Sequence, residues 1–420
     1  MQKNKSNIIN LGCRLNIYEG EIIKSLVSKS ELSHFTIINS CTVTQEAEKK
    51  VSYEIRKAKK KFPENKIVLT GCAAQINPQK FAAMSEVDYV IGNNEKLNFK
   101  TWSDIKNSKS VQVENIFENI NTNHNLVEKF EGKARAYVQI QQGCNHRCTF
   151  CIIPFGRGNN RSVPLGIIVD QIKLLVKNGY KEVVLTGVDI TDYGKDLPGT
   201  PDLFQIVKRI LNLVPELKQL RLSSIDCAEI TSNFWPLLEN QRMMPHFHLS
   251  LQSGNDLILK RMKRRHTKKQ VIDFCHEVKR RRNDVVFGAD LIAGFPTETD
   301  KMFADSIRLI DECNLTHLHI FPYSQRESTP AARMPQVSKN IIKSRAKILR
   351  NHGEKNLLRY LNKQIGTNTT MLVEQSNLRG SFGKSQHFTK IHINKKLSEG
   401  SIINCKIYKI KKDILQAKII

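Results

Sequence analysis

Three cysteines, Cys144, Cys148 and Cys151, lie in one short segment that reads GCNHRCTFC. Thiolates bind zinc and iron, and a structural zinc site normally takes four protein ligands. His146, inside the same segment, would be the fourth, so a zinc site is one interpretation. Three thiolates also suit a cubane iron–sulfur cluster whose fourth iron stays open for another molecule. The spacing therefore predicts a metal centre and leaves both kinds of centre open.

Three more cysteines, Cys13, Cys41 and Cys72, each end a short apolar run, and the runs read NIINLGC, FTIINSC and KIVLTGC. Each run has the composition of a strand and precedes a helix-like segment, which predicts a parallel sheet. The carboxyl ends of parallel strands share one edge, where ligands bind. A single cysteine is more often a small buried hydrophobic residue. Because three stand at equivalent strand ends, we expect them to converge on a second metal centre.

These strands and helices define an N-terminal α/β domain over residues 1–128. A fourth apolar run, VDYVIGN, adds a strand that carries no cysteine. Residues from about 98 to 130 are rich in asparagine and weakly periodic, so an irregular linker is expected there.

Residues 131–350 repeat a strand-like run followed by a helix-like segment six times. The runs read ARAYVQIQQ, EVVLTGVDI, KQLRLSSID, HFHLSLQ, DVVFGADLIAGF and HLHIFPYS. Six units predict a partial (βα)6 barrel, open on one side, with its chemistry at the carboxyl strand ends. The segment GCNHRCTFC follows the first run directly. His246 and His248 alternate along one strand and should face the same side; we interpret them as lining the barrel, with a zinc pair as the alternative.

Residues 356–420 contain short apolar runs between turns rich in Gly, Asn and Lys, which predicts a small β-barrel. Residues 355–420 carry 13 Lys and Arg against 3 Asp and Glu, and the whole chain has a net charge of +26. Such clustering favours a nucleic-acid partner. A second basic run, KRMKRRHTKK at 260–269, either extends that surface or is the solvated face of a helix.

The composition, with 40% hydrophobic and 25% charged residues, is that of a globular protein. No run approaches the roughly 18 apolar residues of a membrane span, and the first residues do not resemble a signal peptide. We therefore expect no membrane contact and a reducing cytoplasm, where the ten cysteines are metal ligands or buried thiols rather than disulfides. Cys275, Cys313 and Cys405 have no partner at ligand spacing and are expected to be buried.

Seven segments together resemble the radical S-adenosylmethionine (SAM) methylthiotransferases. They read LGCRLNIYEGE, INSCTVTQEAEKKV, VLTGCAAQ, QQGCNHRCTFCIIPFGRGNNRS, HFHLSLQSGNDLILKRMKR, ADLIAGFPTET and FPYSQRESTPAARM. The opening LGCRLN and the form SCTVT look most like the branch that acts on threonylcarbamoyladenosine in tRNA. The C-terminal barrel resembles the RNA-binding TRAM domain.

The resemblance implies two 4Fe–4S clusters, one on Cys144, Cys148 and Cys151 and the other on the three cysteines of the N-terminal domain. Such enzymes add a methylthio group to C2 of the adenine at tRNA position 37, beside the anticodon. One SAM molecule supplies the methyl group, and another gives the 5′-deoxyadenosyl radical that abstracts the hydrogen. The implied partners are the tRNA anticodon stem-loop, an electron donor and a sulfur donor, the last two of unknown identity.

The resemblance also places SAM at the strand ends of the barrel. The residues expected to contact it are Phe150, Gly187, Ser224, Asp226, Gln252, Ile292 and Gly294. The pair Asp226-Cys227 stands where many relatives have Glu-Pro, and the shorter carboxylate is expected to keep the role. Cys227 itself is not expected to be a ligand.

Three other functions remain as alternatives. Two keep methylthio transfer but change the acceptor, to isopentenyladenosine in tRNA or to a side chain of a ribosomal protein. The third is a zinc-stabilised RNA-binding protein with no enzymatic activity.

Overall fold

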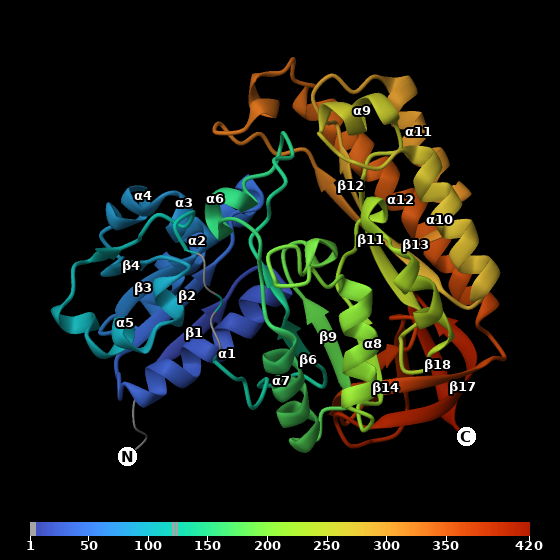
Figure 1. Ribbon diagram of the computed structural model, residues 1–420, viewed down its shortest axis with the longest axis horizontal. Coiled ribbons are helices and arrows are strands. Elements are labelled where there is room, and N and C mark those ends of the chain that lie inside the picture. The colour runs from blue at the N-terminus through green and yellow to red at the C-terminus, as the bar shows by residue number, and fades with distance from the viewer. Residues whose placement is uncertain (1–5, 120–121, 123–124) are drawn as a thin grey trace.

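A five-stranded parallel sheet with strand order β1-β2-β3-β4-β5 forms the N-terminal part of the computed structural model, which describes residues 6–119, 122 and 125–420 (Figure 1). The strands are β1 (Asn7–Asn10), β2 (Phe35–Ser40), β3 (Lys66–Gly71), β4 (Tyr89–Ile91) and β5 (Val111–Gln112). The helices are α1 (Arg14–Lys29), α2 (Gln45–Lys61), α3 (Cys72–Ile76), α4 (Pro78–Ala82) and α5 (Phe99–Ser103), with the 3-10 turns Glu95–Leu97 and Ile105–Asn107.

Strand β2 shows why this sheet forms, because every one of its six residues is buried. Ile37 packs into a core that includes Ile22 of α1, whereas the next residue, Ile38, packs into a core that includes Val51 of α2. Strands covered on both faces read as continuous apolar runs. The runs predicted from the sequence are therefore confirmed as strands.

The prediction of an irregular linker from residue 98 is wrong as far as residue 112. This stretch forms α5, a 3-10 turn and β5, which joins the edge of the sheet. Its anchor is Trp102, which is fully buried and donates from Nε1 to the carbonyl of Lys96 at 2.9 Å. Residues 120–121 and 123–124 of the expected linker lie outside the described residues.

Six parallel strands form the central part, and each matches one of the six runs in the sequence. They are β6 (Ala136–Gln139), β9 (Glu182–Thr186), β10 (Gln219–Leu222), β11 (His246–Gln252), β12 (Val286–Ala293) and β13 (Leu315–Pro322). They make two three-stranded sheets, β10-β9-β6 and β11-β12-β13. The parallel bridges Leu220–Met243 and Ile225–Leu249 join the two sheets, which gives the expected partial barrel. Between β6 and β9, the short strands β7 (Gln141–Gln142) and β8 (Arg161–Ser162) form a small ribbon.

Helices pack around this partial barrel. They are α6 (Ile153–Arg157), α7 (Leu165–Lys177), α8 (Leu203–Leu213), α9 (Asp256–Arg261), α10 (Lys268–Arg281), α11 (Asp300–Glu312) and α12 (Lys339–Lys363), with 3-10 turns at Ile190–Asp192, Cys227–Glu229, Ser232–Glu239 and Pro330–Arg333. The N-terminal part is not a separate body, because Tyr18 of α1 packs in one continuous core with Phe130 and Val138.

The last strands form a closed barrel in the order β14-β15-β16-β18-β17. Their bounds are β14 (Asn368–Asn377), β15 (Gly380–Ser385), β16 (Lys390–Ile393), β17 (Ile402–Lys411) and β18 (Ile414–Ile419). Helix α12 leads into this barrel and spans the boundary expected between residues 350 and 356. Strand β15, which reads GSFGKS, was not among the predicted runs because small and polar residues outnumber apolar ones in it.

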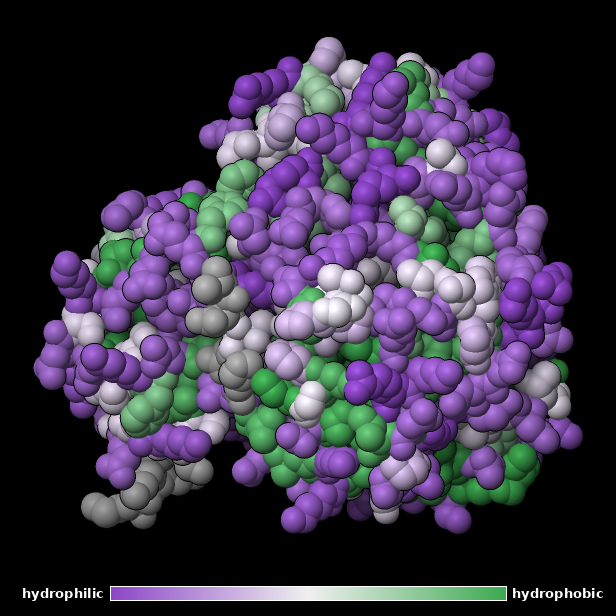
Figure 2. All heavy atoms as spheres, viewed as in Figure 1, coloured by the Kyte–Doolittle hydropathy of each residue, from purple (hydrophilic) through white to green (hydrophobic). Residues whose placement is uncertain are grey.

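Hydrophilic residues cover most of the face drawn in Figure 2, in keeping with the excess of lysine and arginine. Within the described residues, each helix is too short or too polar to cross a membrane. Cys275, Cys313 and Cys405 are buried free thiols, as predicted.

Candidate active site

The first set of thiols lies in a loop held to the partial barrel by backbone hydrogen bonds. The amide of Cys144 donates to the carbonyl of Gly158 at 3.0 Å, and the amide of Cys151 donates to the carbonyl of Cys148 at 3.0 Å. Gly143 has a φ of +70°, and a Cβ there would lie 1.8 Å from the carbonyl oxygen of Asn159. A glycine is therefore required immediately before the first cysteine.

Charged side chains reach two of these three thiols. The Sγ of Cys144 lies 3.9 Å from Asp189 Oδ2, and Arg264 Nη1 lies 3.8 Å from the Sγ of Cys148. Burial raises the pKa of Cys144, and Asp189 raises it further. Burial also raises the pKa of Cys151, to about 12. A metal centre bound here would therefore have to displace the protons of these two thiols.

The second set lies at the carboxyl ends of three neighbouring strands. Cys41 follows β2, Cys72 follows β3, and Cys13 follows β1 at the start of α1. A Cβ on Gly12 would come within 2.5 Å of the Cβ of Cys41, so the first and second strand ends touch only because residue 12 is glycine. Burial raises the pKa of Cys41 to about 11, with Cys72 and Cys13 as further contributors. The structure therefore brings these three cysteines to one edge of the sheet.

Arg157 connects the two sets of thiols. It ends α6, six residues after Cys151, and its Nε donates to the Sγ of Cys72 at 3.1 Å. Its guanidinium also contacts both carboxylate oxygens of Glu19, one at 3.0 Å. The side chain is 2% exposed. A residue of the central part thus completes the surroundings of a cysteine in the N-terminal part.

Lys96 adds a second buried cation on the same carboxylate. Its Nζ lies 2.7 Å from Glu19 Oε2 and 2.6 Å from Asn93 Oδ1, and both Lys96 and Glu19 are fully buried. Burial alone would raise the pKa of Glu19, but Arg157 and Lys96 lower it to about 2. Two cations therefore face one carboxylate beside Cys72, which leaves one positive charge in excess there.

The spacing of the thiols fits a cluster better than a single ion. In tetrahedral zinc sites the sulfurs lie about 2.3 Å from the metal and so about 4 Å from one another. Among the described residues, the groups whose possible ligand atoms all lie within 4.8 Å of one another contain no cysteine. His146, the fourth ligand of the zinc interpretation, instead lies 3.2 Å from Asp189. Three thiols that do not all lie within 4.8 Å of one another suit a 4Fe–4S cluster, because each cysteine binds a different iron of the cubane.

Three of the residues expected to contact SAM belong to a small apolar cluster beside the first thiols. Phe150 packs edge-on against Phe295 with ring centroids 6.3 Å apart, and Ile292 lies in the same cluster. Gly294 has a φ of +72° and faces Ile342, which a Cβ would approach to 2.5 Å. These positions shape the wall next to Cys151.

Two further expected residues, Ser224 and Gln252, are half-buried at the ends of β10 and β11, where a ligand can reach them. Gly187 faces the protein instead, because a Cβ there would lie 2.7 Å from Gln141 Oε1. That oxygen accepts from the amides of Val188 and Asp189, both at 2.9 Å. Gly187 therefore allows Gln141 to fix the loop that carries Asp189.

Asp226 is buried and its carboxylate is already occupied by the protein. It accepts from Arg264 Nη2 at 2.8 Å, from Arg265 Nη2 at 3.1 Å and from the amide of Ala228 at 3.0 Å, and His266 Nδ1 lies 3.3 Å away. Burial opposes ionisation, but His266 and Arg264 hold the pKa of Asp226 well below its usual range. Three residues of the basic run 260–269, Arg264, Arg265 and His266, thus contact Asp226.

Three residues with close contacts to the thiols were not singled out from the sequence: Asp189, Arg157 and Arg264. Asp189 stands two residues after Gly187 in LTGVD, and a carboxylate just after a barrel strand was a usable signal. Arg157 lies in a turn rich in glycine, and Arg264 lies in a run of basic residues, so the composition of neither segment predicts a buried cation.

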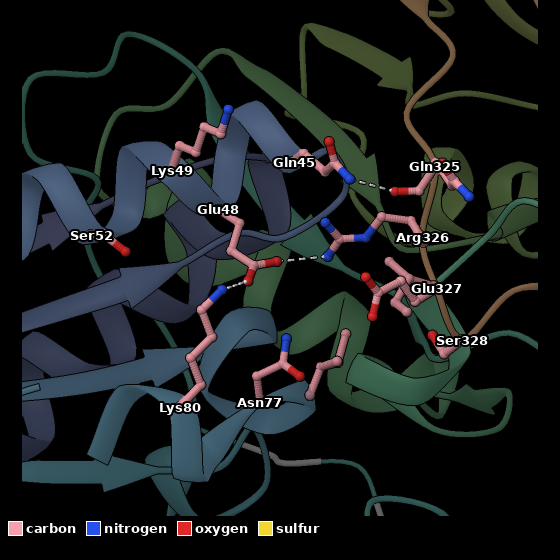
Figure 3. A pocket seen from close by; sticks show the side chains of 12 residues that line it. Gln45, Glu48, Lys49, Ser52, Asn77, Lys80, Gln325, Arg326, Glu327 and Ser328 are labelled. Carbon is pink, nitrogen blue, oxygen red and sulfur yellow. Dashed lines mark hydrogen bonds and ion pairs between the residues drawn. The ribbon is translucent and has the colours of Figure 1, made fainter. Parts of the chain in front are cut away.

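A cavity of about 530 Å³ lies between the N-terminal part and the central part (Figure 3). Ile152, next to Cys151, lines it together with Gln45 and Ile76, which follow Cys41 and Cys72 by four residues. Glu48 in its wall accepts from Lys80 at 2.6 Å and from Arg326 at 2.9 Å, as Figure 3 shows. The cavity is therefore bordered by residues close in sequence to both sets of thiols.

Comparisons with known proteins match this architecture. Residues 138–310 match the radical SAM superfamily, and residues 5–92 match the uncharacterized protein family UPF0004. The chain is 49% identical over 417 residues to a protein of Rickettsia prowazekii (strain Madrid E) named threonylcarbamoyladenosine tRNA methylthiotransferase MtaB, covering 99% of this chain and 98% of that protein. A protein of the same name from Aquifex aeolicus (strain VF5) is 35% identical, with 87% of this chain and 92% of that protein covered.

Among solved structures, the fold is similar to that of the radical SAM methyltransferase TsrM from Kitasatospora setae, a structure with cobalamin and a 4Fe–4S cluster bound. The TM-score is 0.56 at 13% identity, covering 79% of this chain and 77% of that one. At this identity the likeness concerns the fold alone.

Proposed function

Because the chain belongs to the methylthiotransferase family of radical SAM enzymes, we propose that it adds a methylthio group to C2 of threonylcarbamoyladenosine at position 37 of tRNA. The observation that carries this proposal is the presence of two separate sets of three thiols whose neighbours in the sequence line one cavity. One set belongs to the radical SAM part, where a 4Fe–4S cluster and SAM are the cofactors of the superfamily. The other set would hold a second cluster.

A cluster on Cys144, Cys148 and Cys151 supplies, when bound, the electron that cleaves SAM. The chain itself provides the surroundings. Arg264 places a positive charge near Cys148, and Asp226 holds Arg264 in that place. Phe150 and Phe295 exclude water from one side of the loop by their packing. Ser224 and Gln252 would contact SAM from the strand ends.

For the second set, Cys13, Cys41 and Cys72, the residues present also fit a cluster. Arg157 and Lys96 stabilise negative charge near Cys72, and Asn93 Nδ2 lies 3.7 Å from its Sγ. A sulfur delivered at this centre would meet an adenine bound between the N-terminal part and the central part. This arrangement supports sulfur insertion and not SAM cleavage alone.

The closed C-terminal barrel would bind the tRNA, in the manner of a TRAM domain. Its strand residues facing solvent include Lys390, Lys406 and Lys411, which can contact phosphates. A tRNA substrate also agrees with the cytoplasmic location expected from the sequence. The electron donor and the sulfur donor would act on the two clusters.

Nucleoside mass spectrometry of tRNA from a strain that lacks the gene tests this function. We expect methylthio-threonylcarbamoyladenosine to be lost and threonylcarbamoyladenosine to accumulate, with restoration when the gene is returned. Persistence of the methylthio nucleoside, or loss of the isopentenyl form in its place, would show that the substrate is a different one.

A further inference from the structure

One turn of the C-terminal barrel reaches into the floor of the partial barrel. It connects β15 to β16, and its own hydrogen bonds close it, including Ser385 N to Thr389 O at 2.9 Å. Two contacts anchor it: Arg221 donates to the carbonyl of Gln386 at 3.2 Å, and His317 Nε2 lies 3.1 Å from the carbonyl of His387. The turn is thus fixed to strands β10 and β13.

Phe388, in this turn, adopts a left-handed backbone with a φ of +65°. A bulky residue other than glycine rarely adopts that conformation, because it is sterically strained. The ring stacks on His246 at 5.2 Å, and His246 is 4% exposed with no hydrogen-bond partner on either ring nitrogen. The surrounding contacts therefore hold Phe388 at one specific place beneath the strands.

Four cations surround this ring, and they come from four different parts of the chain. Lys384 Nζ lies 3.4 Å from the ring centroid, and the guanidinium carbons of Arg221, Arg135 and Arg14 lie at 5.0, 5.3 and 5.7 Å. We refer to Arg14, Arg135, Arg221 and Lys384 as the cation cluster.

Two carboxylates neutralise only part of the cation cluster. Glu182 pairs with Arg135 at 2.7 Å and with Arg221 at 3.2 Å, and Glu374 pairs with Arg135. Within the part of the chain that the structure describes, Arg14 and Lys384 have no ion pair with an acidic side chain. The four cations face two carboxylates, which leaves an excess of two positive charges. Partly buried cations without partners are costly, and a bound anion would offset that cost.

The cation cluster is accessible, and one of its members lies next to the second set of thiols. Arg14, Lys384 and Phe388 are each half-buried, so solvent reaches them. Arg14 is the residue after Cys13, whereas Arg135 stands at the amino end of β6, opposite to the end that leads to Cys144. A group that extends from an adenine held beside Cys13 would therefore meet Arg14 first.

We propose that the cation cluster, with Arg14 and Lys384 as its free members, binds the carboxylate of the threonylcarbamoyl group and so selects that substrate. This inference rests on the proposed function. The threonyl part of the substrate carries one carboxylate on a short arm from N6 of the adenine, whereas an isopentenyl group has no charge. An uncharged arm would leave Arg14 and Lys384 unpaired, which gives a physical basis for discrimination.

The test compares two anticodon stem-loops, one with threonylcarbamoyladenosine at position 37 and one in which only the threonine carboxylate is converted to a carboxamide. Binding is measured by fluorescence anisotropy with the full chain after anaerobic cluster reconstitution. The wild-type protein should bind the acid at least about tenfold more tightly than the amide, as expected for a charge-assisted contact in a partly buried site. Equal affinities for the two RNAs would overturn the proposal without any variant.

Lys384→Met and Arg14→Met should lose that preference, because they weaken binding of the acid and leave binding of the amide almost unchanged. Lys301→Met, which removes an exposed lysine of α11, is the matched control and should keep the full preference. Iron content and the thermal midpoint of each variant show whether its fold is retained. An equal loss for acid and amide would assign the cluster to a backbone phosphate and reject the proposal.

The same samples separate this inference from the proposed function. If the wild-type enzyme methylthiolates an isopentenyladenosine stem-loop and not the threonylcarbamoyl one, the proposed function itself fails. If it methylthiolates the threonylcarbamoyl RNA but Lys384→Met keeps the preference for the acid, only the cation cluster is excluded.

Discussion

Each of the two sets contains three thiols, but the fold brings them together in different ways. Cys144, Cys148 and Cys151 come from one loop, so local spacing brings them together. Cys13, Cys41 and Cys72 come from three strand ends, and only the complete sheet brings them together. The first set has charges at its margin, whereas the second has two buried cations on one buried carboxylate. A local site depends on its loop, but an assembled site depends on the packing of distant residues.

Removal of one thiol from each set is the most direct test of whether the two sets have different roles. Cys148→Ala should abolish SAM cleavage, because the radical SAM cluster loses one of three ligands. Anaerobic protein should fall from about eight irons to about four. Assay of 5′-deoxyadenosine and methionine checks this, and cleavage at the wild-type rate would contradict the ligand assignment.

Cys41→Ala should give the opposite pattern. SAM cleavage should continue, but no methylthio product should form, since this set would handle the sulfur. Mass spectrometry of the RNA after reaction measures the product, and the cleavage assay serves as the internal control. Product formation by this variant would show that the second set is not needed for sulfur insertion.

Arg157→Met tests the dependence of the second set on the central part. It leaves Lys96 and Glu19 as one pair, removes the donor to Cys72, and should lower the free energy of unfolding by about 3–5 kcal/mol, as for a broken buried ion pair. Urea denaturation of the metal-free protein measures this. Arg147→Met is the matched control, because Arg147 is exposed, and it should cost less than about 1 kcal/mol. Equal losses of unfolding free energy for the two variants would mean that the buried contacts of Arg157 stabilise the protein no more than the surface contacts of Arg147.

Asp226→Asn tests the corresponding support of the first set. It should lower the free energy of unfolding by a smaller amount, about 1–3 kcal/mol, since an amide keeps part of the hydrogen bonding. The folded-state pKa of Asp226 is lowered, so its stabilisation is complete above the unfolded value of 3.8 and is lost as the pH falls below that. The difference in free energy of unfolding between wild type and variant, measured by urea denaturation, should therefore disappear under acid conditions. A constant difference down to low pH would mean that charge is not the cause.

The smallest expected effect is a pH dependence of RNA binding. Burial lowers the pKa of Lys384 to about 8. The groups that face it are Glu374, Arg135, Arg14, Arg221 and His317. A bound carboxylate would raise this pKa, so the preference for the acid over the amide should be complete below pH 8 and should decline a fewfold above it. Lys384→Met should show no such decline in anisotropy titrations.

The sequence carried most of the fold because its strands are covered on both faces. Runs such as KIVLTGC have a single interpretation, and the six runs of the central part are confirmed as strands. Strand β15, which reads GSFGKS, was missed because its composition is not typical of a strand. A closed barrel can still use this segment, because Gly383 has no side chain, and a Cβ there would lie 2.0 Å from the carbonyl oxygen of Leu372. Such a strand is defined by its neighbours and not by its own composition.

The candidate site likewise has residues that the local sequence predicts and residues that only the packing explains. The six cysteines could be found from spacing and from strand ends, but their charged neighbours could not. Arg157 contacts Glu19 across 138 residues of sequence, and Arg264 contacts Asp226 across 38. Asp226, singled out for SAM, has its carboxylate committed to Arg264, Arg265 and His266. Long-range pairings of this kind depend on the three-dimensional packing.

Arg157 also has a consequence for the order of events during synthesis. The ribosome completes the N-terminal sheet, with Cys13, Cys41 and Cys72, before it reaches residue 157. Until then Glu19 has Lys96 as its single cation, and the surroundings of Cys72 carry no excess positive charge. The buried cation pair beside Cys72 is therefore complete only after the first set of thiols has been made and its loop has docked.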